Sequence, residues 1–417
     1  MEPNPWMILP FVLLLAAIAL GPLTAHKLWE RHYPKVSLIL GALTLGYYLF
    51  VLHNYSHVGH VAHEYISFIA LVGSLFVVSG GIHIRVKSGA SPWLNVLFLL
   101  AGAVIANVLG TTGAAMLMIR PWIRMNQHRI AAYHIVFFIF IVANIGGCLT
   151  PIGDPPLFLG FLSGVPFWWV IQNAWPMWLL GVVLLLAVFY PIDLLNFRRN
   201  PIPTSPGNAL ETRGFEGAIN LLFLAVILAA VFIDKPTGLR EVIMFGAGIG
   251  SYFLTSKKIH AANDFNFHPI QEVAILFIGI FATMMPALDW LNANARELLG
   301  QNPSSGTFYW GTGILSSLLD NAPTYLGFLS ALFGVSGTDH MDELLQQHSR
   351  NVLAISIGAV FFGAATYIGN GPNFMVKAVA DQNHVRTAGF LGFLFKYTLP
   401  ILLPVLLIIW LIFFLNR

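Results

Sequence analysis

Two aspartates lie inside long apolar runs of this sequence, where a carboxylate is most costly. Asp154 closes the motif TPIGD at residues 150–154, and Asp320 directly precedes Asn321 in a second run. An ionised carboxylate in the middle of a membrane costs at least about 2.5–3.5 kcal/mol unless a partner compensates it. Such residues mark ion pathways and proton relays, so Asp154 and Asp320 are predicted to carry the chemistry.

Neutral oxygen ligands accompany each aspartate. The first predicted site comprises Asn107, Thr111 or Thr112, Asn144, Thr150, Gly153 and Asp154. The second comprises Asp320, Asn321, Thr324, Thr366, Gly369, Asn370 and Asn373. One carboxylate among hydroxyl, amide and carbonyl oxygens suits a hard monovalent cation, and sodium is the natural candidate. A desolvated carboxylate has a raised pKa that a bound cation lowers again, so a proton and a sodium ion would compete for the same oxygens.

An internal repeat relates the two sites. Residues 147–158 align without gaps with residues 363–374 in the pattern G-x-x-T-x-I-G-[D/N]-x-P-x-F, and residues 106–113 match 320–327 at nearly the same offset. Packed transmembrane helices are often kinked by Gly and Pro, but a kink does not explain why Thr, Asp or Asn, and Pro recur together. The sequence therefore predicts two copies of one site-forming unit.

The composition requires elements that cross a membrane. Hydrophobic residues make up 57% of the 417-residue chain and charged residues only 9%, whereas soluble domains have about 25% charged residues. The fold class is predicted to be an all-α polytopic membrane protein, a single domain over 1–417. The candidate segments are 6–25, 36–52, 65–84, 93–119, 131–168, 175–195, 217–234, 239–255, 269–288, 305–334, 350–380 and 387–416.

Four of these segments contain helix-breaking or polar residues at mid-membrane depth. We predict re-entrant hairpins at 93–119 and 305–334 and broken helices at 131–168 and 350–380, since broken backbone is tolerated there only when it is buried in protein or lines a wet cavity. Repeat one then spans about 36–195 and repeat two about 239–416. A cytoplasmic loop, 196–216, joins them.

The basic residues predict the orientation. With both hairpins returning to their side of entry, both termini lie outside, and the outer side holds only Lys235, Arg240, Arg296, Arg350 and Arg417. Most other basic residues fall in inner loops, as the positive-inside rule requires. The two repeats then have inverted orientations, which is typical of secondary transporters.

The roles of the other ionisable residues are less specific. Lys396 is a candidate counter-ion of Asp154 or Asp320, although snorkelling explains it equally well. Glu272 is a candidate proton relay, but its position after His268 and Pro269 favours an interfacial cap. His53, His57, His60 and His63, with Glu64, have a spacing that could bind a transition metal or sense pH, or simply form an interfacial loop.

The motif TPIGD, with Asp-Asn-Ala-Pro-Thr at 320–324, resembles the ion transporter superfamily, and Gly146–Asp154 is similar to the sodium-site segment of its sodium/proton antiporters. A subgroup labelled as citrate transporters is also similar, and the resemblance covers about 85–385. It implies a homodimer, an elevator-type movement of a transport part against a scaffold, and a site formed by two hairpin tips and two broken helices. Dicarboxylate carriers of the superfamily have Ser-Asn-Thr at both tips. This chain has residues 106–108 (ANV) and 320–322 (DNA) instead.

The sequence therefore predicts a secondary transporter in the membrane of a bacterial cell, exchanging Na⁺ or Li⁺ for H⁺, with no enzymatic activity and no cofactor. The alternative is a carrier of citrate or a dicarboxylate coupled to Na⁺ or H⁺. A metalloenzyme built on the histidines would not explain the repeat, and a channel is disfavoured by two closed half-sites. A net charge of +3 without a basic stripe excludes a nucleic-acid partner. The expected partners are the lipid bilayer, the small cation and a second copy of the chain.

Overall fold

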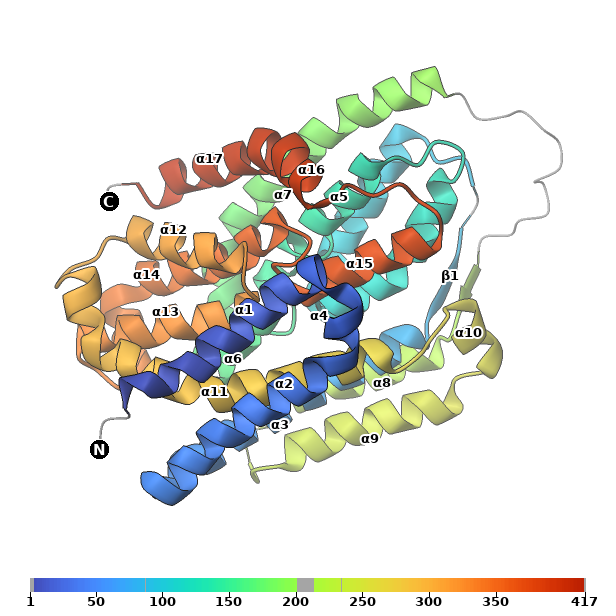
Figure 1. Cartoon of the computed structure of the whole chain (residues 1–417). Helices are drawn as coiled ribbons and strands as arrows, with labels where there is room; N and C mark the ends of the chain where they lie inside the picture. Colours follow the sequence, from blue (N-terminus) through green and yellow to red (C-terminus); the bar gives the residue numbers. More distant parts are fainter. Residues whose placement is uncertain (1–3, 87, 201–213, 234, 416–417) are drawn as a thin grey trace.

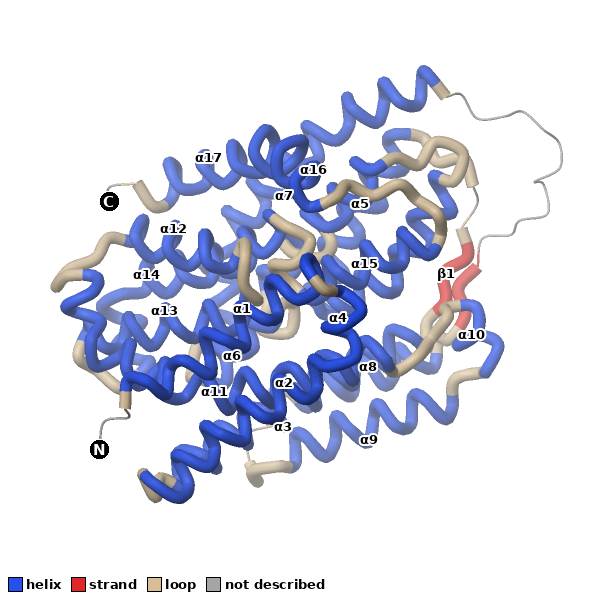
Figure 2. Tube along the Cα trace, in the orientation of Figure 1, coloured by secondary structure: helices blue, strands red, loops and turns tan. Residues whose placement is uncertain are grey.

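Helices form most of the protein (Figures 1 and 2). The computed structural model describes residues 4–86, 88–200, 214–233 and 235–415. Within them, seven helical segments are long and apolar enough to cross a membrane. These are Lys27–Val51, Tyr55–Gly80, Pro92–Asn126, Ala132–Leu149, Phe167–Arg199, His268–Leu299 and Phe390–Phe413. The predicted class, an all-α polytopic membrane protein, is confirmed.

One group of helices packs along the side that Figure 1 shows at the bottom. It contains η1 (Pro5–Ile8), α1 (Leu9–Thr24), α2 (His26–Gly46) with its π-helical continuation η2 (Tyr47–Val51), α3 (Tyr55–Gly80), α8 (Ile219–Ala230), α9 (Leu239–Leu254) and α11 (His268–Leu299). The helices α2 and α11 approach closely at Gly41 and Gly279, and Ser37 donates a hydrogen bond of 2.6 Å to the Ile275 carbonyl. Small residues and hydrogen bonds from hydroxyl groups commonly stabilise contacts between helices in lipid.

Three boundaries in this group differ from the prediction by ten residues or more. The helix predicted at 269–288 continues to Leu299. The helix predicted at 36–52 begins at His26 and contains Pro34 in its interior, so this proline does not end it. The helix predicted at 65–84 begins at Tyr55, where the Asn54 side chain caps it by accepting a hydrogen bond from the His57 amide. His57, His60 and His63 are therefore helical.

Two helical hairpins form the second group of structures. The chain reverses within α4 (Pro92–Asn126) at Gly110, whose φ of 73° favours glycine. The two legs are joined by reciprocal amide hydrogen bonds of 2.7 and 3.1 Å between Asn95 and Asn126. The other hairpin consists of α12 (Ser305–Ser316) and α13 (Asn321–Ser336), whose legs contact each other through Phe308 and Phe328.

A broken helix follows each hairpin. The first comprises α5 (Ala132–Ile141), the short turn η3 (Ile145–Leu149) and α6 (Pro155–Leu162). The second comprises α14 (Met341–Phe362), the turn η5 (Gly363–Ala365) and α15 (Gly371–Gln382). All side chains from Tyr133 to Ile141 are buried, so α5 lies at the centre of the fold.

The remaining elements complete the fold. They are α7 (Phe167–Arg199), α10 (Lys257–Ala262), α16 (Phe390–Phe393), the π-helix η6 (Leu394–Leu402) and α17 (Leu403–Phe413). A short antiparallel pair, β1 (His83–Arg85) with β2 (Gly214–Glu216), was not predicted. It lies at the end of the predicted loop 196–216, of which 201–213 fall outside the described residues.

The two hairpins enter the bundle from opposite ends. The base of α4 lies beside β1, where the Gly89 amide donates to the Met125 carbonyl. The base of α12–α13 lies at the end where η1 begins and α17 ends, and Ser305 there donates to Asn351. Both hairpin tips therefore reach the interior from opposite directions.

A buried polar network braces the base of α4. Asp193 of α7 accepts hydrogen bonds from Arg129 Nη2 at 2.9 Å, from the Tyr133 hydroxyl at 2.7 Å and from Asn95 Nδ2 at 2.9 Å. Its side chain and that of Arg129 are almost completely enclosed. The network ties both legs of the hairpin to α5 and α7.

Replacing Asp193 by alanine is expected to destabilise the fold strongly. It leaves the Arg129 guanidinium buried without its carboxylate, a loss that costs about 3–5 kcal/mol for buried pairs. The measurement is the Tm of the purified protein in detergent. Asp381→Asn is the matched control, because its ion pair with Lys377 lies at the surface. Equal Tm values for the two variants would contradict the assignment.

Candidate functional site

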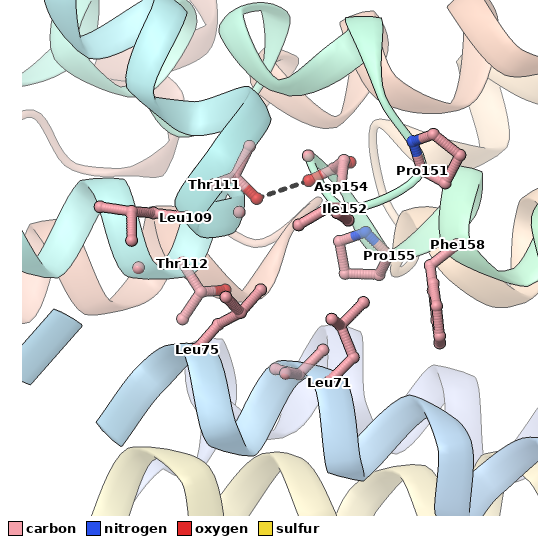
Figure 3. A pocket seen from close by; sticks show the side chains of 14 residues that line it. Leu71, Leu75, Leu109, Thr111, Thr112, Pro151, Ile152, Asp154, Pro155 and Phe158 are labelled. Atoms are coloured by element: carbon pink, nitrogen blue, oxygen red, sulfur yellow. Dashed lines mark hydrogen bonds between the residues drawn. The ribbon is translucent and has the colours of Figure 1, made fainter. Parts of the chain in front are cut away.

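The carboxylate of Asp154 lies where the two halves of the chain meet. It accepts hydrogen bonds from Thr111 Oγ1 at 2.6 Å, from Asn321 Nδ2 at 2.5 Å and from Asn370 Nδ2 at 3.1 Å. Figure 3 shows the bond from Thr111. Asp154 is 1% exposed, and within the described part of the chain all of its hydrogen-bond donors are neutral. The negative charge is therefore hydrogen-bonded without being neutralised.

Backbone contacts place Asp154 and Thr111 against each other. The Thr111 amide, just past the reversal at Gly110, donates to the Gly153 carbonyl at 2.7 Å. Asp154 follows in extended conformation, and Pro155 and Pro156 begin α6. Since the hairpin tip is bonded to the break itself, its hydroxyl reaches the carboxylate directly.

Asn107 and Thr150 hold this junction together. Asn107 donates to the Gly146 carbonyl at 2.7 Å and accepts from the Leu149 amide at 2.8 Å. Thr150 donates to the Asn107 carbonyl at 2.6 Å. Both residues thus join α4 to the first break, while Thr111 contacts Asp154.

Amide side chains join the two broken helices. Asn144 Nδ2 donates to Asn373 Oδ1 at 2.6 Å, and Asn370 Nδ2 donates to Asn144 Oδ1 at 3.1 Å. Asn373 also donates to the Thr366 carbonyl, and Thr366 donates to the Ser317 carbonyl in the hairpin tip of α12–α13. The two predicted groups of site residues therefore form one continuous cluster.

Asp320 has a different environment. It caps α13 by accepting a 3.0 Å hydrogen bond from the Ala322 amide, and Thr324 donates to its carbonyl. Its neighbour Asn321 is completely buried, and the Oδ1 atom of Asn321 has no hydrogen-bond partner. A buried amide oxygen without a partner can accept a hydrogen bond from a water molecule or coordinate a cation.

A pocket of about 20 Å³ lies beside Asp154. Thr111, Thr112, Gly153 and Asp154 line one side, and leucines of α3 line the other (Figure 3). A space of roughly 10–15 Å³ holds one water molecule, so this pocket has room for one water or one small ion.

A second cavity, which we call the vestibule, has a volume of about 430 Å³. It lies between α2, α3 and α11 on one side and α4, α15 and the α12–α13 tip on the other. Asp320 and Asn370 line its inner part, and exposed residues after α10, among them Asp264 and Asn266, line its outer part. It therefore connects the cluster to the end of the molecule near β1 and α10.

Several predicted residues lie away from the carboxylates. Lys396 is exposed and forms no ion pair with any described residue, so it is not placed as a counter-ion. Glu272 lines the vestibule. His60 lies 3.3 Å from Glu64, but the described residues contain no group of three or more His, Cys, Asp or Glu arranged for a metal ion.

Sequence reasoning did not find the vestibule. Part of its lining, including Trp29, Glu30 and Asp264, comes from segments predicted as loops, and Phe374 comes from the predicted broken helix 350–380. The signal in the sequence that could have pointed to this cavity was the pair of acids Asp264 and Glu272, which lie close together in a chain with few charges.

The helices, the paired breaks and the buried carboxylate define a multi-pass integral membrane protein, and comparison with known proteins identifies it as a transporter. Residues 2–414 match the family described as "Putative citrate transport", and the chain belongs to that family. An uncharacterized transporter of Synechocystis sp. is 24% identical over 309 residues, 67% of this chain and 68% of the relative. A 46 kDa membrane protein of Mycobacterium leprae is 24% identical over 322 residues, 71% of each chain.

Two glycines provide a test of the close backbone contact between Gly147 and Gly153 at the first break. A Cβ on Gly153 would lie 2.0 Å from the Gly147 carbonyl oxygen, whereas a Cβ on Gly371 would have no heavy atom within 4 Å. Gly153→Ala is expected to cost at least the roughly 1–3 kcal/mol of overpacking. The Tm of purified protein checks this, with Gly371→Ala as the control. A tolerated Gly153→Ala would show that the break does not need this contact.

Proposed function

We propose that this transporter exchanges sodium or lithium ions for protons. The observation that carries the proposal is the Asp154 carboxylate, buried among a hydroxyl and two amides beside an ion-sized pocket. A carboxylate has about four lone-pair positions, and three are used, so acceptor capacity remains for a cation or a proton. The unpartnered Oδ1 of Asn321 adds another acceptor.

Competition between a sodium ion and a proton for the Asp154 carboxylate is sufficient for exchange. Asp154 keeps its charge when a sodium ion neutralises it and takes up a proton when the ion leaves, since an isolated charge at this depth is costly. Both occupied forms are neutral, and an empty charged form is disfavoured. Transport then requires only that the cluster is exposed alternately to the two sides.

The vestibule supports an alternating-access cycle. It reaches the cluster from the end that carries Arg85, Arg129 and Lys257. We propose that this end is cytoplasmic, because the positive-inside rule favours that side for basic residues. We propose that the two halves are inverted repeats and that this arrangement is the inward-facing state of an elevator-type homodimer. The hairpins that enter from opposite ends and the paired breaks support this arrangement.

The alternative is a carrier of citrate or a dicarboxylate coupled to sodium or protons, which the family description favours. The vestibule is large enough for such an anion. Carboxylates are usually held by paired guanidinium or ammonium groups. Among the residues that line the vestibule, Arg120 is the one guanidinium, and it already lies 3.7 Å from Asp264. The lining therefore favours the cation.

Proteoliposome assays separate the two functions. A sodium jump across vesicles containing the protein is expected to move protons, reported by an internal pH dye, and labelled citrate is expected not to accumulate. Citrate uptake driven by sodium or protons, with no proton movement after a sodium jump alone, would establish the alternative.

The carboxylates give the mechanistic test. Asp154→Asn is expected to abolish sodium-dependent proton flux, because an amide cannot exchange a proton for a cation. Asp320→Asn is expected to reduce the flux by removing charge at the inner part of the vestibule. Asp342→Asn, an exposed acid in the first turn of α14, is the control and should retain the flux. Undiminished flux in Asp154→Asn would refute the competition mechanism.

A further inference from the structure

The vestibule is much larger than an ion path requires. Its volume of about 430 Å³ compares with about 20 Å³ for the pocket beside Asp154. Sites for small organic molecules typically occupy about 300–1,000 Å³ and are mostly apolar with a few polar groups. The vestibule therefore has the dimensions of an organic ligand site.

Aromatic side chains from both sides line this cavity. They are Trp29, Tyr33, Phe76, Phe265, Phe277 and Phe374. Met116 and Met375, which have flexible and polarizable side chains, also line it. These residues come from α2, α3, α4, α11, α15 and the loop before α11, so several elements contribute aromatic side chains to the wall around a bound molecule.

The ionisable groups of the lining are predominantly acidic. Glu30 and Glu272 lie near the aromatic residues, Asp264 lies at the outer rim, and Asp320 lies at the inner part. Arg120 faces Asp264 at 3.7 Å. His268 lies at the exposed start of α11. Acidic groups combined with aromatic faces recognise organic ammonium ions, through charge attraction and cation–π contact.

We propose that the vestibule binds organic ammonium ions with an aromatic or aliphatic body. The cationic head lies toward Glu272 and Asp320, and the apolar body lies against Trp29 and Phe277. Such a ligand occupies the route to the cluster without entering the small pocket. The proposal does not depend on sodium–proton exchange, since it requires only the vestibule.

Two probes of matched framework and opposite charge test the proposal. The affinities of 2-phenylethylammonium and 3-phenylpropanoate for the purified full-length protein in nanodiscs are measured by calorimetry, with citrate as a third probe. The ammonium ion is expected to bind, and neither anion is expected to bind or displace it. Equal affinity for the two phenyl probes, or displacement of the ammonium ion by citrate, would overturn the proposal without reference to transport.

A charge-removing variant locates the site. Glu272→Gln is expected to weaken binding of 2-phenylethylammonium at least about tenfold, within the range of a desolvated cation contact. Asp342→Asn lies outside the vestibule and is expected to leave the affinity unchanged. Equal affinities in the two variants, each with the elution profile and Tm of the unmodified protein, would refute the site. The comparison of opposite charges on the unmodified protein stands even if Glu272→Gln does not fold.

Discussion

The hydrogen-bonded burial of one carboxylate, that of Asp154, is the constraint around which the structure is arranged. Its donors come from three separate places, namely the first hairpin tip, the second hairpin tip and the second broken helix. Each of these places is a break in a helix, because only a break can bring short polar side chains and free backbone groups to this depth. The breaks satisfy one another's polar groups, so the cluster is stable only when both halves are assembled.

Two mechanical properties follow from this arrangement. Asn107 and Thr150 fix the first hairpin tip to the first break, and the network around Asp193 fixes the base of the same hairpin to α5 and α7. The hairpin is thus held at both ends. The elevator-type movement proposed above, a displacement of the whole cluster, would keep these hydrogen bonds, whereas opening this hairpin would expose buried polar groups.

The two cavities differ in size and in the side chains that line them. The small pocket beside Asp154 admits one water or ion, whereas the vestibule has acidic and aromatic walls at a much larger scale. In the vestibule the guanidinium of Arg120 already faces Asp264. The family description names citrate, and the cation exchange proposed above rests on the chemistry of these two cavities within the framework of that family.

The class, the helix breaks and most residues of the cluster could be predicted from the sequence, because charge is scarce in an apolar chain and each polar residue at depth stands out. Thr111, Asp154, Asn321 and Asn370 were all among the predicted residues. The hydrogen bonds of Asn321 and Asn370 to Asp154, which join the two predicted groups of residues, and the exposed position of Lys396 are seen only in the folded chain. The tertiary structure also decided that Trp29, Glu30 and Phe374 share a cavity. Contacts between residues far apart in sequence depend on how helices pack, and local patterns of polarity carry no information about that packing.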